Sequence, residues 1–470
     1  MRRTKIICTM GPACRSEETI EEMCLAGMNV ARLNFSHGSY AEHKETIERI
    51  KKVRKKLGLP VAILLDTKGP EYRIGTFKNK KVTVKEGDDF VFTAEDIEGD
   101  EERVSVSYKE LPSQMNSGDI ILLNDGLVSF RVTETGKDFV RCTVLTGGVI
   151  SDRKSMAFPG KILDSVFLSQ QDKDDLLFGI ENDIDYVAAS FVSNAENVCD
   201  IKRFLAENGG EDIDVIAKIE NRSGVDNITQ ICQSCEGIMV ARGDLGVEIP
   251  FEELPAVQKK LITVCRLMGR RVITATEMLE SMTANIRPTR AEISDVANAV
   301  YDGTSAVMLS GETAVGAHPA RVVDVMSAIC CETEKNIAYN DIFFSSKFSI
   351  KNNIDAVSYA ACSMALTVGA RAITVCTMTG SSARMVSRFR PDIDIIGLTT
   401  SEKAWRKLSL SWGVLPVLSE ELPSAEIIFY SAAKRSAETL KLKKGDTVIV
   451  VGSTVSGKQG CTNDIRLETI

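Results

Sequence analysis

The sequence predicts an α/β protein: a (β/α)8 TIM barrel that is interrupted by a small all-β lid domain and followed by an α/β C-terminal domain. Three observations support this fold class. Short apolar runs alternate eight times with polar junctions and helical stretches. The alternation breaks between residues 71 and 163, where short alternating strands are separated by turn signals. After about residue 340 the strand–helix alternation resumes with a separate set of strands.

The eight apolar runs are each short enough to be a buried strand of a parallel sheet. They lie at residues 5–10, 29–33, 61–65, 186–190, 215–219, 237–241, 271–275 and 306–309. An open doubly wound sheet has the same periodicity, so it remains the alternative to a closed barrel.

Helical stretches fill most of the gaps between these runs. Residues 16–26 open with a serine cap, residues 194–208 end at Gly209 and Gly210, and residues 252–268 end at Gly269. These start and stop signals predict one helix after each of the runs that they follow.

The interrupting segment and the tail have their own strand signals. Residues 81–84 and 139–144 alternate in polarity, and the turns at 124–126 and 135–137 are of the hairpin type. In the tail, strands are expected at 370–377, 393–398, 414–418 and 447–451. We therefore expect a barrel from residues 1–70 and 164–340, a lid from 71–163 and an effector-binding domain from 341–470. The two barrel segments total 247 residues, close to the ~250 of a typical barrel.

Composition limits the class of partner. The chain has 470 residues, of which 57 are basic and 65 acidic, so its net charge of −8 argues against nucleic acid or an anionic membrane as the main partner. Its 13 cysteines lack regular spacing, and the one C-x-x-C pair, Cys232 and Cys235, is expected in the core rather than at a zinc ion. No run approaches the ~18 apolar residues of a membrane span and no apolar leader is present, so we expect a cytoplasmic protein.

The ends of the predicted strands are polar. In a barrel the catalytic groups lie at the C-terminal ends of the strands. The polar residues found there are Arg32, Asn34, Ser36, Asp66, Thr67, Lys68, Lys218, Glu220, Arg242, Gly243, Asp244, Thr276, Glu277, Ser310 and Glu312.

A cation and two carboxylates stand out among them. Strand periodicity places Lys218 and Glu220 on one face, and Asp244 follows the next strand. Two carboxylates with open positions for substrate oxygens and water suit magnesium better than zinc. Arg32 and Lys218 would add positive charge for a phosphorylated substrate. A structural Lys218–Glu220 ion pair, with Asp244 as a helix cap, is the alternative.

Hydroxyl-rich and glycine-rich turns allow two interpretations each. Thr276 and Ser310 either carry protons through water or cap the following helices. The segment from Thr377 to Ser382 either binds a phosphate at a helix N-terminus or is an ordinary strand-to-helix turn. The loop at 452–458 matches most of a P-loop, but Gln459 stands where the magnesium hydroxyl is required, and too few residues follow for the helix and later strand of that fold.

Read together, the strand ends resemble those of the pyruvate kinase family, in particular its bacterial members. The segments that carry the resemblance are NVARLNFSHG at 29–38, LDTKGPE at 65–71, IAKIEN at 216–221, MVARGDLGVE at 239–248, RPTRAE at 287–292 and MLSGET at 308–313. The resemblance covers the whole chain. It implies a phosphotransferase that moves the phosphoryl group of phosphoenolpyruvate to ADP, with magnesium (or manganese) and potassium as cofactors, a homotetrameric assembly and no nucleic-acid or membrane partner.

The resemblance also implies roles for single residues. Lys218 would stabilise the transferring phosphoryl group and the enolate, Arg32 would contact the phosphate, and Thr276 with the backbone of Gly243 and Asp244 would receive the carboxylate of phosphoenolpyruvate. Ser310 would join Thr276 in a proton relay. The remaining sets are Glu220 and Asp244 for magnesium; Asn34, Ser36, Asp66 and Thr67 for potassium; Arg73, His37 and Lys154 for the nucleotide; and Thr377, Thr379, Ser381 and Ser382, with the loop at 452–460, for a sugar-phosphate or nucleotide activator.

A few positions refine this resemblance. Glu71 is similar to the glutamate of potassium-dependent family members, in which no lysine supplies an internal cation. Asn124 and Ser305 stand where the family usually has aspartate, and residues 154–160 (KSMAFPG) differ from the sequence that is usual in the family at this segment. None of these departures touches the predicted magnesium ligands. A catalytically silent sugar-phosphate sensor and a magnesium-enolate carbon–carbon lyase are the alternative functions.

Overall fold

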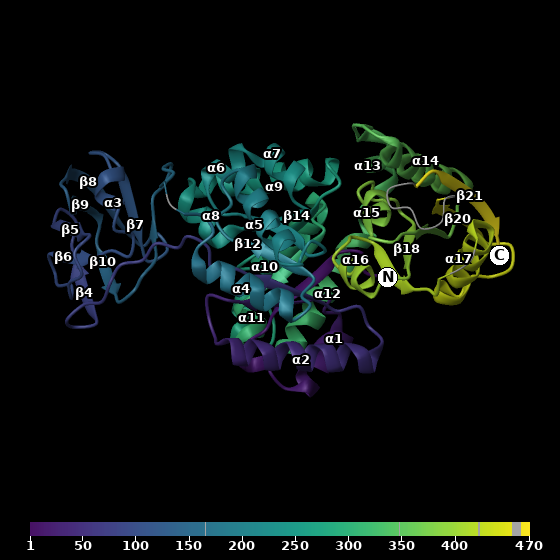
Figure 1. Cartoon of the computed structure of the whole chain (residues 1–470), viewed down its shortest axis with the longest axis horizontal. Coiled ribbons are helices and arrows are strands. Elements are labelled where there is room, and N and C mark those ends of the chain that lie inside the picture. The colour runs from purple at the N-terminus through teal and green to yellow at the C-terminus, as the bar shows by residue number, and fades with distance from the viewer. Residues whose placement is uncertain (165, 347, 422–423, 454–461) are drawn as a thin grey trace.

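The computed structural model of the chain describes residues 1–470 except 165, 347, 422–423 and 454–461. Its parts lie in a row, with a β-rich segment at one end, a barrel in the centre and the C-terminal α/β segment at the other end (Figure 1). Within the residues described, no helix combines the length and the apolar character needed to cross a membrane.

Eight parallel strands close into a barrel, which confirms the predicted fold class. β1 pairs with both β2 and β16, so the sheet has no free edge and the open-sheet alternative is wrong. Each strand lies within one residue of its predicted run, because a continuous apolar run buried on both faces is a strong signal. The strands are β1 Lys5–Thr9, β2 Val30–Asn34, β3 Ala62–Asp66, β12 Tyr186–Ala189, β13 Asp214–Ile219, β14 Gly237–Ala241, β15 Arg271–Ala275 and β16 Ala306–Leu309.

Helices surround this barrel, and six of those described begin at a polar side-chain cap. Ser16 accepts the Thr19 amide at 3.1 Å to start α1, and Asn194 caps α5 in the same way. The helix predicted from residue 252 instead begins at Leu254, after a 3-10 turn at Phe251–Glu253. The barrel helices are α1 Glu17–Ala26, α2 Tyr40–Leu57, α4 Gln170–Glu181, α5 Ala195–Glu207, α6 Arg222–Asp226, α7 Ile228–Ser234, α8 Arg242–Glu248, α9 Leu254–Leu267, α10 Arg290–Asp302, α11 Gly311–Ala314 and α12 Pro319–Lys335.

The segment inserted after β3 is built from strands, as predicted, around the aromatic core of Phe90, Phe92 and Phe130. The turn at Asn124 and Asp125 has φ values of 53° and 56°, the left-handed geometry of a tight hairpin, and joins the antiparallel strands β7 and β8. The elements are β4 Lys81–Val84, β5 Asp89–Thr93, β6 Arg103–Ser105, α3 Leu111–Gln114, β7 Ile120–Leu123, β8 Val128–Thr135, β9 Phe139–Thr146, β10 Gly148–Ser151 and β11 Met156–Ala157.

The C-terminal segment is a five-stranded sheet in the order β19-β18-β17-β20-β21. The expected strands are present, and a further strand that was not predicted, β21 Asp464–Thr469, pairs antiparallel with β20. The alternation of Ile465 and Leu467 with polar residues was the available signal. The other elements are α13 Tyr339–Ser345, α14 Asn353–Val368, β17 Ala372–Cys376, α15 Ser381–Ser387, β18 Asp394–Thr399, α16 Glu402–Leu408, β19 Val414–Leu418, α17 Ala425–Leu440 and β20 Thr447–Gly452.

Candidate active site

The barrel brings the predicted catalytic side chains to one rim. Arg32 lies near the end of β2, Asp66 ends β3, Lys218 lies near the end of β13, and Thr276 and Ser310 follow β15 and β16 directly. Because all eight strands run parallel, their C-terminal ends meet at the same end of the barrel. The pairing register supports this: Asn34 lies opposite Asp66, and Lys218 lies opposite Met239, five residues before Asp244.

Lys218 is at the centre of a buried polar cluster. Its ammonium lies 2.9 Å from Glu220 Oε1 and 3.1 Å from Asp66 Oδ1, and donates to Ser190 Oγ at 2.7 Å. Burial works against the charge, but the carboxylates of Asp66 and Glu220 outweigh it and raise the pKa of Lys218. The side chain is therefore a permanently charged cation, only 9% exposed, at the mouth of the barrel.

Glu220, like Asp66, is a fully buried carboxylate of the cluster. Its Oε2 accepts the amide of Phe191 at 2.6 Å, and Phe191 adopts a left-handed φ of 57° to present that amide. Burial raises the pKa of Glu220 to about 7, against the lowering effect of Lys218 and with a further rise from the charge of Asp244. A bound cation would hold this carboxylate in its ionised form.

Asp244 lies in the first turn of α8 and is exposed. Its carboxylate makes no hydrogen bond with another described residue, so both oxygens are free to bind a ligand. No group of three or more histidine, cysteine or acidic side chains in the described chain is arranged to hold a metal by itself. Glu220 and Asp244 thus fit a hard divalent ion that takes its remaining ligands from substrate oxygens and water, as magnesium does in phosphate sites.

Arg32 is held in place by two neighbours and keeps one free edge. Its Nε donates to Asp66 Oδ2 at 2.6 Å and its Nη1 donates to Thr9 Oγ1 at 2.8 Å. Its Nη2 makes no hydrogen bond within the described part of the chain, which leaves donors for an anionic ligand.

Thr276 has the backbone strain that is common at functional sites. Its φ is 70° and that of Glu277 is 52°, a conformation that side chains with a branched Cβ rarely adopt. The hydroxyl donates to the Ala275 carbonyl at 2.6 Å and accepts the Gly243 amide at 2.8 Å. Thr276 therefore joins the end of β15 to the first turn of α8, next to Asp244.

Ser310 carries an unsatisfied hydroxyl. Its Oγ is buried without a hydrogen-bond partner among the described residues and makes no capping bond to α11. Its amide instead donates to Glu312 Oε2 at 2.6 Å, while Glu312 Oε1 accepts the Leu279 amide at 3.0 Å. The helix-cap interpretation of Ser310 is therefore wrong, and its hydroxyl is available for water or a ligand.

The residues predicted for potassium lie at the ends of β2 and β3. Asn34 Oδ1 accepts the Ser36 amide at 3.1 Å, and the Asn34 and Asp66 backbones are in register. Thr67 Oγ1 accepts the Ser190 amide at 3.2 Å. Four oxygen-bearing side chains are thus gathered on two neighbouring strand ends.

The residues predicted for the nucleotide are only partly brought together. Arg73 pairs across a β-bridge with Ser155, next to Lys154, and its Nη2 lies 2.5 Å from Glu71 Oε1. His37 is exposed in the turn after β2 and has no contact with Arg73 or Lys154 among the interactions of the described residues.

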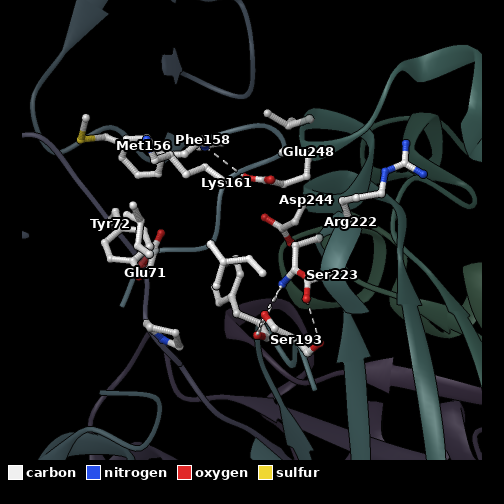
Figure 2. Close-up of a pocket in the computed structure, with 18 of the residues that line it drawn as sticks. Glu71, Tyr72, Met156, Phe158, Lys161, Ser193, Arg222, Ser223, Asp244 and Glu248 are labelled. Atoms are coloured by element: carbon white, nitrogen blue, oxygen red, sulfur yellow. Dashed lines mark hydrogen bonds between the residues drawn. The ribbon is translucent and has the colours of Figure 1, made fainter. Parts of the chain in front are cut away.

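A cavity of about 650 Å³ lies between the inserted β-segment and the barrel. Figure 2 shows Glu71, Tyr72, Met156 and Phe158 on one side and Ser193, Ser223, Asp244 and Glu248 on the other. Of the residues predicted for magnesium and phosphoenolpyruvate, only Asp244 lines it.

A hydrogen bond joins the two sides of this cavity. The Phe158 amide donates to Glu248 Oε1 at 3.2 Å, and burial raises the pKa of Glu248 to about 7. This bond ties the lid side of the cavity to α8, the helix that carries Asp244.

The predicted effector residues lie between β17 and α15. Thr377 Oγ1 accepts the Gly380 amide at 3.0 Å, Thr379 is exposed, and Ser381 begins α15. Ser382 Oγ is 2.5 Å from Thr462 Oγ1. Most of the loop at 452–460, which completes this predicted site, lies outside the described residues.

Sequence reasoning missed two residues that position the site. Ser190 hydrogen-bonds both Lys218 and Asp66, and Thr9 holds Arg32. Glu312, which the sequence already placed at a strand end, accepts the Ser310 amide. Ser190 and Thr9 lie at the ends of predicted strands, so the rule that found the other site residues would also have found them.

Comparisons with known proteins agree with this architecture. A family model described as the pyruvate kinase barrel domain matches residues 1–323, and one described as the pyruvate kinase alpha/beta domain matches residues 355–467. The pyruvate kinase of Clostridium acetobutylicum is 44% identical over 472 residues, covering 100% of both chains. That of Staphylococcus epidermidis is 43% identical over 473 residues, covering 100% of this chain and 81% of the relative.

A solved structure shows the same arrangement. The crystal structure of a pyruvate kinase from Cryptosporidium parvum superposes with a TM-score of 0.94 at 38% identity, covering 100% of this chain and 96% of that one. The matching strand ends, the closed barrel with its inserted β-segment and these full-length relatives lead to one conclusion: the chain belongs to the pyruvate kinase family and is a phosphotransferase.

Proposed function

We propose that the protein transfers the phosphoryl group of phosphoenolpyruvate to ADP, giving pyruvate and ATP, in the last step of glycolysis. The observation that carries this proposal is the buried Lys218 ammonium, within 3.1 Å of Asp66 and 2.9 Å of Glu220, beside the unpaired carboxylate of Asp244. A fixed cation next to oxygen ligands for a metal is what phosphoryl transfer requires, because that reaction depends on positioning and charge neutralisation.

Lys218 and the free edge of Arg32 would neutralise the charge that moves during transfer. The P–O bond to the enol oxygen breaks as a terminal phosphate oxygen of ADP bonds to phosphorus, and negative charge builds up on the enolate oxygen. Because Lys218 is held by Ser190, Asp66 and Glu220, it needs no reorganisation at that moment. Arg32, fixed by Asp66 and Thr9, would orient the phosphoryl group.

The metal would be held by Glu220 and Asp244. Magnesium (or manganese), when bound, supplies positive charge that polarises the phosphoryl and carbonyl oxygens. The donor set supports this assignment, since both residues offer carboxylate oxygens and Asp244 has no protein partner among the described residues. Thr276 and the backbone amides of Gly243 and Asp244 would bind the substrate carboxylate. The Gly243 amide, which now donates to the Thr276 hydroxyl, would then donate to the substrate instead.

The enolate becomes pyruvate when its methylene carbon takes up a proton. We place Thr276 and the unsatisfied hydroxyl of Ser310 in the relay that delivers this proton through water. Protonation at carbon gives the stable ketone of pyruvate and makes the forward transfer effectively irreversible.

The remaining assignments rest on the family resemblance. Asn34, Ser36, Asp66 and Thr67 would hold potassium, while Arg73, His37 and Lys154 would contact the nucleotide. Thr377, Thr379, Ser381 and Ser382 would bind a phosphorylated activator. We also propose a homotetramer, a cytoplasmic location, and domains at 1–70 with 164–340, at 71–163 and at 341–470, which the separate hydrophobic cores support.

A coupled assay of pyruvate formation tests this proposal. Phosphoenolpyruvate is supplied with or without ADP, magnesium, potassium and candidate sugar phosphates or nucleotides. We expect product only when phosphoenolpyruvate, ADP and magnesium are all present, with further activation by potassium. No turnover under any condition would favour a silent sensor, and turnover without ADP would favour a magnesium-enolate lyase; either result would overturn the proposal.

A further inference from the structure

Arginines gather where the barrel meets the C-terminal segment, at the end of the barrel opposite the active site. Six of them line one small pocket, together with Ser305, Ser387, Ser411 and Trp412. Figure 1 shows α15 on the side of the C-terminal segment that faces the barrel. The six are Arg266 in α9, Arg270 and Arg271 at the start of β15, and Arg384, Arg388 and Arg390 in and after α15.

Two of these arginines pair with a carboxylate, and a third donates to a main-chain carbonyl. Arg271 Nη1 lies 2.7 Å from Asp214 Oδ2, and Arg388 Nη1 lies 3.1 Å from Asp355 Oδ1. Arg270 Nε donates to the Cys232 carbonyl at 2.6 Å.

The other three have no carboxylate partner. Arg390 donates to Ser305 Oγ at 3.0 Å and to the Gly303 carbonyl at 3.1 Å, and it stacks on Trp412. The side chains of Arg266 and Arg384 make no hydrogen bond or ion pair with another described residue. Their charge is therefore not compensated by a contact within the described chain.

Nearby carboxylates are already engaged. Asp214 also pairs with Lys407 at 2.8 Å, and Glu236, which acts on Arg384 from a distance, pairs with Lys202 at 2.7 Å. The pocket is thus a net positive hollow between two parts of the protein.

Burial makes this excess charge costly. The Nε atoms of Arg266, Arg384 and Arg390 are buried without a partner in the described structure, and Arg390 is only 4% exposed. Burial lowers the pKa of Arg384 to about 10 and that of Arg390 to about 9. A buried cation without a counter-ion destabilises the folded state, and unsatisfied buried donors point to a bound water or ion.

We propose that this pocket, lined by Arg266, Arg384 and Arg390, binds a small inorganic anion that bridges the barrel and the C-terminal segment. Its volume of about 10 Å³ accommodates one water-sized group, so a halide, or a single oxygen of a phosphate, matches its size. The pocket opens beside Arg271, the first residue of β15, whereas Thr276 follows the other end of that strand. The anion site is therefore separate from the site of phosphoryl transfer.

The test is the thermal unfolding midpoint of the full-length protein in sodium chloride, sodium phosphate and sodium gluconate at equal ionic strength. Gluconate is too large for the pocket, so it screens surface charges as the other salts do without binding at this site. The variants are R384Q and R266Q, which remove cations without breaking a hydrogen bond to another described residue. R435Q is the matched control, since Arg435 is exposed on α17 and, among the described residues, its side chain pairs with Glu438 alone.

We expect chloride to raise the midpoint of the wild type and R435Q by about 2 °C or more above gluconate, with saturation. In R384Q and R266Q chloride should not raise the unfolding midpoint above its value in gluconate. In gluconate itself these variants should unfold at or above the wild-type temperature, because an unpaired buried charge has been removed. If phosphate but not chloride raises the unfolding midpoint of the wild type, and R384Q and R266Q lose this rise, the bound anion is an oxyanion. Phosphate bound at the active site would instead raise the midpoint of all variants equally. An equal chloride increment in wild type and R384Q, or no anion-specific increment in the wild type, would overturn the proposal.

Discussion

Replacing Lys218 with methionine separates the two roles that the structure gives this residue. The substitution keeps the length of the side chain and removes the ammonium that lies 2.9 Å from Glu220, 3.1 Å from Asp66 and 2.7 Å from Ser190. Loss of one preorganised charge-stabilising group costs about 10²–10³-fold in kcat, or about 2.7–4 kcal/mol. We therefore expect kcat to fall by at least about 10²-fold.

The same substitution also affects folding. Removing one partner of a buried ion pair costs about 3–5 kcal/mol, because the other charge stays buried. Asp66 keeps Arg32 as a partner at 2.6 Å, but of its partners among the described residues Glu220 keeps only the Phe191 amide, so we expect a loss near 3 kcal/mol. In the double variant K218M/E220Q the unpaired carboxylate is gone, and its destabilisation should be smaller than the sum of the single ones by about 1–3 kcal/mol.

The assays are steady-state turnover in the coupled assay and chemical unfolding of the same preparations. Lys202→Met is the matched control, because Lys202 forms a partly exposed pair with Glu236, which contributes about 0–1 kcal/mol. We expect this control to leave kcat unchanged. A Lys218→Met enzyme with kcat within tenfold of the wild type would refute the assignment of Lys218 to the reaction.

Three further predictions follow from single side chains. Activity of the wild type should depend on potassium, and Glu71→Lys, which adds a fixed cation in the cavity, should raise the activity measured without potassium; equal wild-type rates with and without potassium would contradict this. Thr276→Val removes the hydroxyl that we place in the proton relay, so kcat should fall by about 10²-fold or more, and an unchanged kcat would exclude Thr276 from the relay. Because the Gly243 amide loses its acceptor, the free energy of unfolding should also fall, by about 1–3 kcal/mol. Burial, with a smaller effect of Arg2, lowers the pKa of Lys5 to about 7, so between about pH 7 and pH 10.5 the unfolded chain binds more protons than the folded one and stability rises with pH. Lys5→Met should remove this rise, which is at most about 5 kcal/mol, and parallel pH profiles of unfolding for the two proteins would contradict it.

Most of the barrel was predictable because its strands are continuous apolar runs with polar ends. The strand β14 lies where the sequence places it, and Lys218 and Glu220 lie on one face as the period of two requires. β21 was not predicted: it is an edge strand in which only Ile465 and Leu467 mark the alternation, a weaker signal than the continuous apolar runs of the barrel.

The finer geometry of the site depends on contacts between distant segments. The left-handed backbone of Thr276 has no local signal, since threonine disfavours that conformation, and the partner of its hydroxyl, the Gly243 amide, lies in α8, 33 residues away. The link between Lys218 and Ser190 likewise joins two strand ends that are 28 residues apart. The excess of arginine at the barrel's other end becomes visible only when α15 is placed against the end of α9.

The most direct test of the proposed reaction is phosphorus NMR of the transfer itself. Wild-type protein is mixed with phosphoenolpyruvate, ADP, magnesium and potassium, and the phosphorus signals are followed in time. We expect the phosphoenolpyruvate signal to be replaced by the γ-phosphate signal of ATP in equal amount, and this conversion to be slower by at least about 10²-fold in Lys218→Met. Loss of phosphoenolpyruvate with release of inorganic phosphate and no ATP, or no change in its signal, would contradict the proposed phosphoryl transfer.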